Sequence, residues 1–181
     1  MQRERTIVIQ IEGRANDTDA PTVEDFFEQI RDYVYLICAV EKAVAEDQTS
    51  HLVWRVTDAS KSSPLRVFLT AFPDVYGTDI STRYSRTIKY TKDGLNALSK
   101  GEKTPVNFPN DALQYADKTF ARISNGLAQT KIDFGNNTPT IVFNNENARK
   151  ARTHTKLLLD PYGKEQSYIE LGSSEGTVQN I

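Results

Sequence analysis

The chain of 181 residues contains a single cysteine and only two histidines. With Cys38 alone, no intramolecular disulfide can form, which suits a reducing compartment, and we expect a cytoplasmic protein. Nitrogen and sulfur ligands for a metal are limited to Cys38, His51 and His154, which do not have the spacing of a zinc site. We therefore predict no metal site and no cofactor, with Cys38 as a core thiol and both histidines as solvated surface residues.

Long hydrophobic runs and recognisable catalytic motifs are also missing. The first apolar run is broken by Gln10, so we predict neither a signal peptide nor a membrane span. A faint calcium-loop pattern after Asp17 has Thr22 where the turn needs glycine. The loop Gly172–Gly176 lacks the Gly-Lys-Ser/Thr ending of a phosphate loop. We predict no catalytic residues; an enzyme of unrecognised class stays open, and a non-enzymatic protein is favoured.

Charge is unevenly distributed along the chain. Residues 1–60 hold 6 basic and 12 acidic side chains, whereas residues 61–160 hold 15 and 9, within a net charge of −2. The halves could simply mix their charges over a solvated surface. The alternative is a basic face that meets an acidic partner.

Alternating side chains predict an antiparallel sheet. Isoleucines alternate with other residues in Thr6–Glu12, and two alternating runs form the segment His51–Pro73. We place this pair at the centre of the sheet, with Trp54 as a core anchor under a long helix. Short extended segments at Lys131–Phe134 and Thr140–Phe143 could pair as a hairpin.

Helical spacing predicts one long amphipathic helix, with Thr22 as its N-cap. Its expected inner face is Val23, Phe26, Phe27, Ile30, Tyr33, Val34, Ile37, Val40 and Val44. Charged residues, including Asp32 and Glu41, take the remaining positions, which we expect to face solvent.

Three further helices are predicted. The second ends at Lys100 with Gly101 as its cap, and it carries an internal Gly94. The third has Asn110 as its N-cap and Leu127 as its last inner position. The fourth begins at Asn144 or Asn145 and ends at Leu159.

Two groups of polar and basic residues are candidates for binding an anion or a partner. The first lies in the loop Asp58–Pro64, although a polar strand connection has the same composition. The second lies on the second and fourth helices and could follow phosphates, although a solvated helix face gives the same pattern. The candidate residues are Ser60, Lys61, Ser62, Arg83, Arg86, Lys89, Arg149, Lys150 and Arg152.

Three segments carry a resemblance to known sequences: WRVTDASKSSPLR, RISNGLAQTKIDFG and ELGSSEGTVQNI. They resemble segments of a group of uncharacterised bacterial proteins in which the last motif leads into a further small β-rich region. The resemblance implies no activity and no site residues. It favours Ile181 as a cut or disordered boundary.

The sequence thus predicts an α+β domain over residues 1–165, with an antiparallel sheet packed under a long amphipathic helix and about three further helices. Residues 166–181 are predicted to be an extended segment, which could be the start of a further small β-rich region that is cut or disordered. The favoured function is a non-enzymatic binding or regulatory module that acts through a protein partner or by self-association. A nucleic-acid-binding accessory domain is the first alternative, and no membrane is expected as a partner.

Overall fold

The structure is a computed structural model, and it describes residues 5–14, 20–60, 64–101, 104–135 and 138–161. Lys61, Ser62 and the predicted extended segment 166–181 lie outside these ranges. Within them, five strands and four helices follow one another along the chain. They are β1 (Thr6–Gly13), α1 (Val23–Val44), β2 (Leu52–Ala59), β3 (Leu65–Pro73), α2 (Ser81–Lys100), α3 (Asn110–Asn125), β4 (Leu127–Asp133), β5 (Ile141–Asn144) and α4 (Asn145–Leu159).

The strands form one antiparallel sheet with the order β2-β3-β1-β4-β5. Strand β3 lies between β1 and β2, which α1 connects, and β1 lies between β3 and β4, which α2 and α3 connect. Two interleaved units of this kind make the ferredoxin-like arrangement, to which β5 and α4 are added here. The predicted α+β class is confirmed. The placement of the β2–β3 pair at the centre is wrong, because β1 is the middle strand and β2 is an edge.

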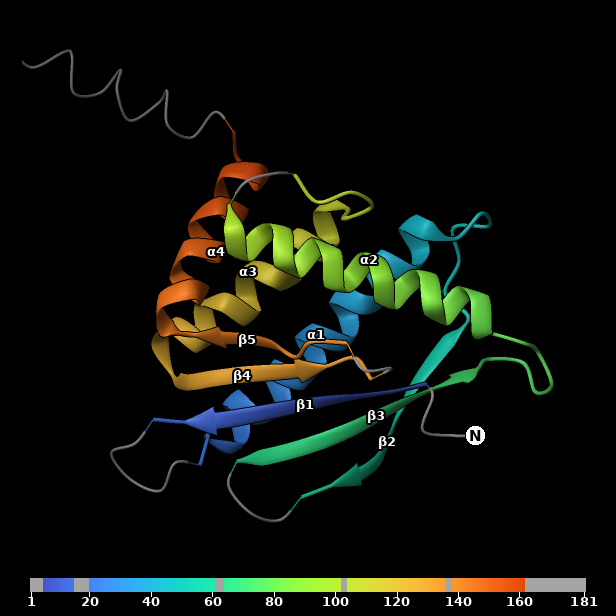
Figure 1. Ribbon diagram of the computed structural model, residues 1–181, viewed down its shortest axis with the longest axis horizontal. Coiled ribbons are helices and arrows are strands. Elements are labelled where there is room, and N and C mark those ends of the chain that lie inside the picture. The colour runs from blue at the N-terminus through green and yellow to red at the C-terminus, as the bar shows by residue number, and fades with distance from the viewer. Residues whose placement is uncertain (1–4, 15–19, 61–63, 102–103, 136–137, 162–181) are drawn as a thin grey trace, which may run out of the picture.

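The core lies on one side of the sheet, where all four helices pack (Figure 1). Ile7, Ile9 and Ile11 of β1 are fully buried against the helices, and Leu69 of β3 and Phe143 of β5 share this layer. Because successive strand residues point to opposite faces, the alternate residues form a second face on the other side of the sheet.

The helix ends follow the local sequence. Thr22 caps α1, its hydroxyl accepting from the Asp25 backbone N–H at 3.1 Å, and Gly101 ends α2 in the left-handed conformation at φ 68°. Asn144 caps α4 in a reciprocal capping box. At α3 the N-cap is Pro109 rather than Asn110, and Leu127 opens β4 instead of ending the helix.

The inner face of α1 differs from the prediction at both apolar and charged positions. Val23 is 75% exposed and Phe27 is 64% exposed, whereas Asp32 and Glu41 are fully buried. Helical spacing places these carboxylates outside the apolar stripe. Such positions face solvent only if no other helix covers them. Here α2 and α3 both pack against α1, and they bring arginines to the two acids.

Arg122 of α3 holds the first buried acid. Its Nη2 lies 2.9 Å from Asp32 Oδ2 and 3.0 Å from Glu28 Oε2, and its Nη1 donates to Gln29 Oε1 at 2.8 Å. The buried Gln29 amide then donates to the Thr130 hydroxyl of β4 at 3.2 Å. One network therefore joins α1, α3 and the sheet.

Trp54 has an aromatic neighbour on the second helix. Its ring packs against Tyr84 of α2, with 6.1 Å between the ring centroids. It is partly buried at the edge of the core.

Gly94, inside α2, has its Cα in contact with an aromatic ring. A Cβ at this position would lie 2.2 Å from Cε2 of the buried Phe108. On helix propensity alone, Gly94→Ala would stabilise the protein by about 1 kcal/mol. Because overpacking costs about 1–3 kcal/mol, we expect net destabilisation, measured by urea unfolding. In a Phe108→Leu background the same substitution should cost less; an equal cost in both backgrounds would contradict this account.

Candidate functional site

The second face of the sheet is a surface that no described helix covers (Figure 1). Its side chains alternate with those of the core along every strand. From β2 to β5 they are Val53, Arg55, Thr57, Asp58; Arg66, Phe68, Thr70, Phe72; Thr6, Val8, Gln10, Glu12; Gln129, Lys131, Asp133; Val142 and Asn144. We call this surface the open face.

A hollow of about 590 Å³ lies on the open face and extends across β2, β3, β1 and β4. Half-buried Val8 and Phe68 form its floor, with Asp58 on one side and Asp133 on the other. At one end, the Thr70 hydroxyl lies 2.8 Å from those of both Thr6 and Thr57. The hollow therefore combines an apolar floor with hydroxyl and carboxylate groups.

Both carboxylates at the hollow lack a basic partner among the described residues. One oxygen of Asp58 accepts from the Ala59 backbone N–H at 2.8 Å, and one oxygen of Asp133 accepts from the Gly135 N–H at 2.8 Å. No described lysine or arginine forms an ion pair with either. Both side chains are exposed, so their negative charge is available to a ligand.

A second hollow of about 340 Å³ adjoins the first and has basic side chains. Arg66 Nε donates to Gln10 Oε1 at 3.0 Å, and Lys131 Nζ lies 3.3 Å from Glu12 Oε1. Burial alone would raise the pKa of Glu12, but hydrogen bonds from Gln129, Gln10 and Lys131 lower it. The open face thus has an acidic zone and a basic zone side by side.

The two aspartates are too far apart for paired-carboxylate chemistry. They lie on β2 and β4, with β3 and β1 between them, which at about 4.8 Å per strand separates them by about 14 Å. Two carboxylates that cleave a glycosidic bond are at most about 9.5 Å apart. The hollow therefore presents binding groups without converging acids and bases.

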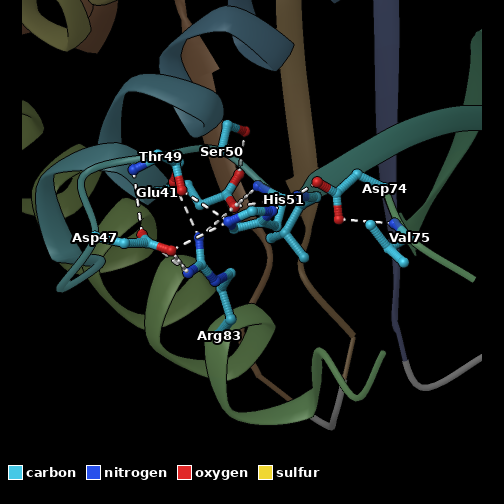
Figure 2. Close-up of polar contacts among 9 residues, drawn as sticks. Glu41, Asp47, Thr49, Ser50, His51, Asp74, Val75 and Arg83 are labelled. Carbon is cyan, nitrogen blue, oxygen red and sulfur yellow. Dashed lines mark hydrogen bonds and ion pairs between the residues drawn. The ribbon is translucent and has the colours of Figure 1, made fainter. Parts of the chain in front are cut away.

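A polar cluster on the helix side surrounds His51, at the start of β2 (Figure 2). Its Nδ1 lies 2.6 Å from Asp74 Oδ2, and its Nε2 lies 3.1 Å from Asp47 Oδ2 and 2.7 Å from Thr49 Oγ1. Hydrogen bonding to Asp74 raises the pKa of His51 above its ordinary 6.5. The side chain is 37% exposed, but its contacts make His51 more than the solvated surface residue that the sequence predicted. Because both ring nitrogens are engaged, His51 is placed to join loops, not to accept a substrate proton.

Glu41 ties the same cluster to the core. Its buried carboxylate accepts from the Ser50 hydroxyl at 2.6 Å and from the backbone N–H groups of His51 and Leu52 at 2.7 and 3.1 Å. Arg83 Nη1 lies 3.4 Å from Glu41 Oε1, and its Nη2 lies 2.9 Å from Asp47 Oδ2. A hydrogen bond from the Thr49 backbone N–H, together with Arg83, holds the pKa of Asp47 well below its usual range.

Several of the predicted basic residues have partners within the chain. Arg83 belongs to the cluster just described, Lys150 lies 2.8 Å from Glu146, and Arg152 lies 3.3 Å from Asp117. The first turns of α2, with Arg83, lie away from α4, which sits beside the other end of α2 (Figure 1). The structure therefore does not bring the two basic groups into one continuous surface.

The remaining predicted residues are exposed or structural. Arg86, Lys89 and Arg149 are exposed, with Lys89 Nζ 5.9 Å from the Tyr90 ring centroid. The Ser60 hydroxyl accepts from the Arg66 backbone N–H at 2.9 Å, which holds the base of the β2–β3 connection. Burial raises the pKa of Cys38 to about 11, so it stays a protonated thiol at neutral pH.

Comparison with known proteins finds no matching family model, no matching curated protein and no matching solved structure. No helix in the described ranges is long and apolar enough to cross a membrane. Among the same residues, no group of three or more histidine, cysteine, aspartate or glutamate side chains could hold a metal ion.

Sequence reasoning missed the open face as a site. Alternation in β1 and β3 indicated that Val8, Gln10, Arg66 and Phe68 point away from the main apolar rows. It could not show that Asp133 lies directly opposite Val8, because that depends on β4 pairing with β1.

Removal of the Glu41 carboxylate should destabilise the fold. Glu41→Ala leaves Arg83 and two backbone N–H groups short of a partner. We expect the free energy of unfolding to fall by about 3 kcal/mol, at the low end for breaking a buried ion pair. Glu46→Ala, at an exposed position just after the same helix, is the control and should change it by less than about 0.5 kcal/mol. Equal effects of the two variants would contradict the structural role of Glu41.

The His51 contacts should make stability depend on pH. Because the pKa of His51 is raised in the folded state, protonated His51 stabilises the fold. The contribution is fully present below pH 6.5 and is lost as the pH rises through the raised pKa. The melting temperature of His51→Gln should therefore lie furthest below that of the wild type in acidic buffer. The gap should narrow in alkaline buffer, and a gap that widens there would refute the assignment.

Proposed function

We propose that this chain is a non-enzymatic binding module that receives a protein partner on the open face of its sheet. The observation that carries the proposal is the hollow over Val8 and Phe68. Half-buried apolar side chains there lie next to Asp58, Asp133 and Arg66, none of which has an ion-pair partner among the described residues. Protein interfaces combine the same elements, an apolar centre with polar and charged groups around it.

A protein fits this surface better than a nucleic acid does. The open face carries both signs of charge within neighbouring rows, and its carboxylates would repel a phosphate backbone. On the helix side, ion pairs occupy Arg83, Lys150 and Arg152. A nucleic-acid-binding accessory domain is the alternative, in which the exposed Arg86 and Lys89 would contact phosphates.

An enzyme is less favoured because the titratable groups do not converge. Asp58 and Asp133 are on opposite sides of the hollow, and the raised pKa of His51 comes from contacts that occupy both ring nitrogens on the other side of the sheet. A binding role does not need convergent acids and bases; the exposed apolar and charged side chains of the open face are sufficient for it.

A charge placed at the centre of the open face should abolish partner binding. Val8→Asp puts a carboxylate on the apolar floor, whereas the control Val75→Asp makes the same change at a valine that is 62% exposed in the loop after β3. After mild crosslinking in native cell extract, we expect the wild type and Val75→Asp to retain the same partner and Val8→Asp to lose it. Quantitative mass spectrometry measures the recovery, and circular dichroism checks that each variant is folded.

Protection of lysines gives an independent measure of the same contact. Lys131 lies on the open face and Lys89 on α2, so a bound partner should slow the acylation of Lys131 and leave Lys89 unchanged. A partner that Val8→Asp retains, or one that protects Lys89 alone, would show that binding uses another surface.

A further inference from the structure

Along β1 and β4, the open face is divided into short and long side chains. On one side of the sheet's midline, Thr6, Val8, Asp133 and Gly135 line the larger hollow. On the other side, further along the same two strands, are Gln10, Glu12, Lys131 and Gln129, which are long. On β1 and β4 the hollow therefore lies over the short side chains, and the long ones stand next to it.

The same division separates the charges. Asp58, Phe68, Val8 and Asp133 form one row across the strands, which we call the acidic row. Arg66, Gln10, Lys131 and Val142 form the next row, which we call the basic row. Because two residues along a strand span about 6.6–6.8 Å, the two rows are separated by that distance.

We propose that the partner of the open face is a second copy of this chain, bound about a two-fold axis that lies between the acidic and basic rows; this rests on the proposed function. Such an axis runs across the strands in the plane between the two sheets. It turns the second copy so that its basic row covers the acidic row of the first, and the reverse contact follows by symmetry.

At two of the three central contacts that result, a short side chain meets a longer polar one. Asp133 meets Lys131 of the partner subunit, Phe68 meets the partner's Arg66, and Val8 meets the partner's Gln10. Sheets pack about 10 Å apart, a gap that one short and one long side chain can fill together. The first contact is an ion pair, and the second places a guanidinium over an aromatic ring.

The pattern continues one row further on each side. The axis that relates Val8 to Gln10 also relates Thr6 to the partner's Glu12 and Gly135 to the partner's Gln129. Each pair again joins a small side chain with a long polar one. Packed sheets cross at about 30°, so the match is closest at β1, the middle strand, and loosens toward the edges.

The test uses sedimentation velocity on the full chain over a concentration range, with two charge reversals. The wild type should associate to twice its 20.4 kDa. Asp133→Lys places a lysine opposite Lys131 of the partner subunit, and Lys131→Asp places an aspartate opposite the partner's Asp133. Because like charges then face each other, the dissociation constant of the dimer should rise at least tenfold in each variant alone. Mixed together, the two variants pair lysine with aspartate at both positions and should recover the dimer.

Controls separate this proposal from the broader one. Lys89→Asp on the helix side should leave the wild-type dimer unchanged. Asp133 is exposed, so Asp133→Lys keeps the test valid even if Lys131→Asp folds poorly. A wild type that stays at 20.4 kDa, or a dimer that tolerates Asp133→Lys, overturns the second copy as partner. The wild type could be monomeric and still capture a different protein. If Val8→Asp then loses that protein, the open face is a binding surface and only the second copy as partner is overturned.

Discussion

The buried carboxylates of α1 are the constraint on which the rest of the structure depends. Asp32 and Glu41 have no exposed surface, and a buried charge is tolerated only when it is paired and hydrogen-bonded. Arg122 from α3 pairs with Asp32 near the middle of the helix, and Arg83 from α2 pairs with Glu41 in its last turn. These two contacts fix where α2 and α3 lie against α1, and hence the helical layer over one side of the sheet.

The other side of the sheet carries charges that this helical layer does not pair. On the helix side, the acids near the junction of α1 and β2 are matched by Arg83 and His51, so that region holds loops in place. On the open face, Asp58, Asp133 and Arg66 have no such partners among the described residues. A surface that combines unpaired charges with a half-buried apolar floor is a more plausible contact surface than one whose charges are already matched.

Much of the fold could be predicted from local sequence because its signals are local. Alternation identified β1 and the β2–β3 pair, and capping residues such as Thr22, Gly101 and Asn144 marked helix ends correctly. The errors came where packing decides. Val23 and Phe27 have the helical spacing of core residues, but they lie on a side of α1 that stays exposed.

The candidate site shows the same division. The sequence by itself determined the element types, the alternation that turns Val8 and Phe68 away from the core, and the scarcity of metal and thiol chemistry. Only the tertiary structure decided that β1 lies between β3 and β4, which brings Asp58, Phe68, Val8 and Asp133 into one row. Strand order and register arise from contacts between residues distant in the chain, so no local pattern contains them.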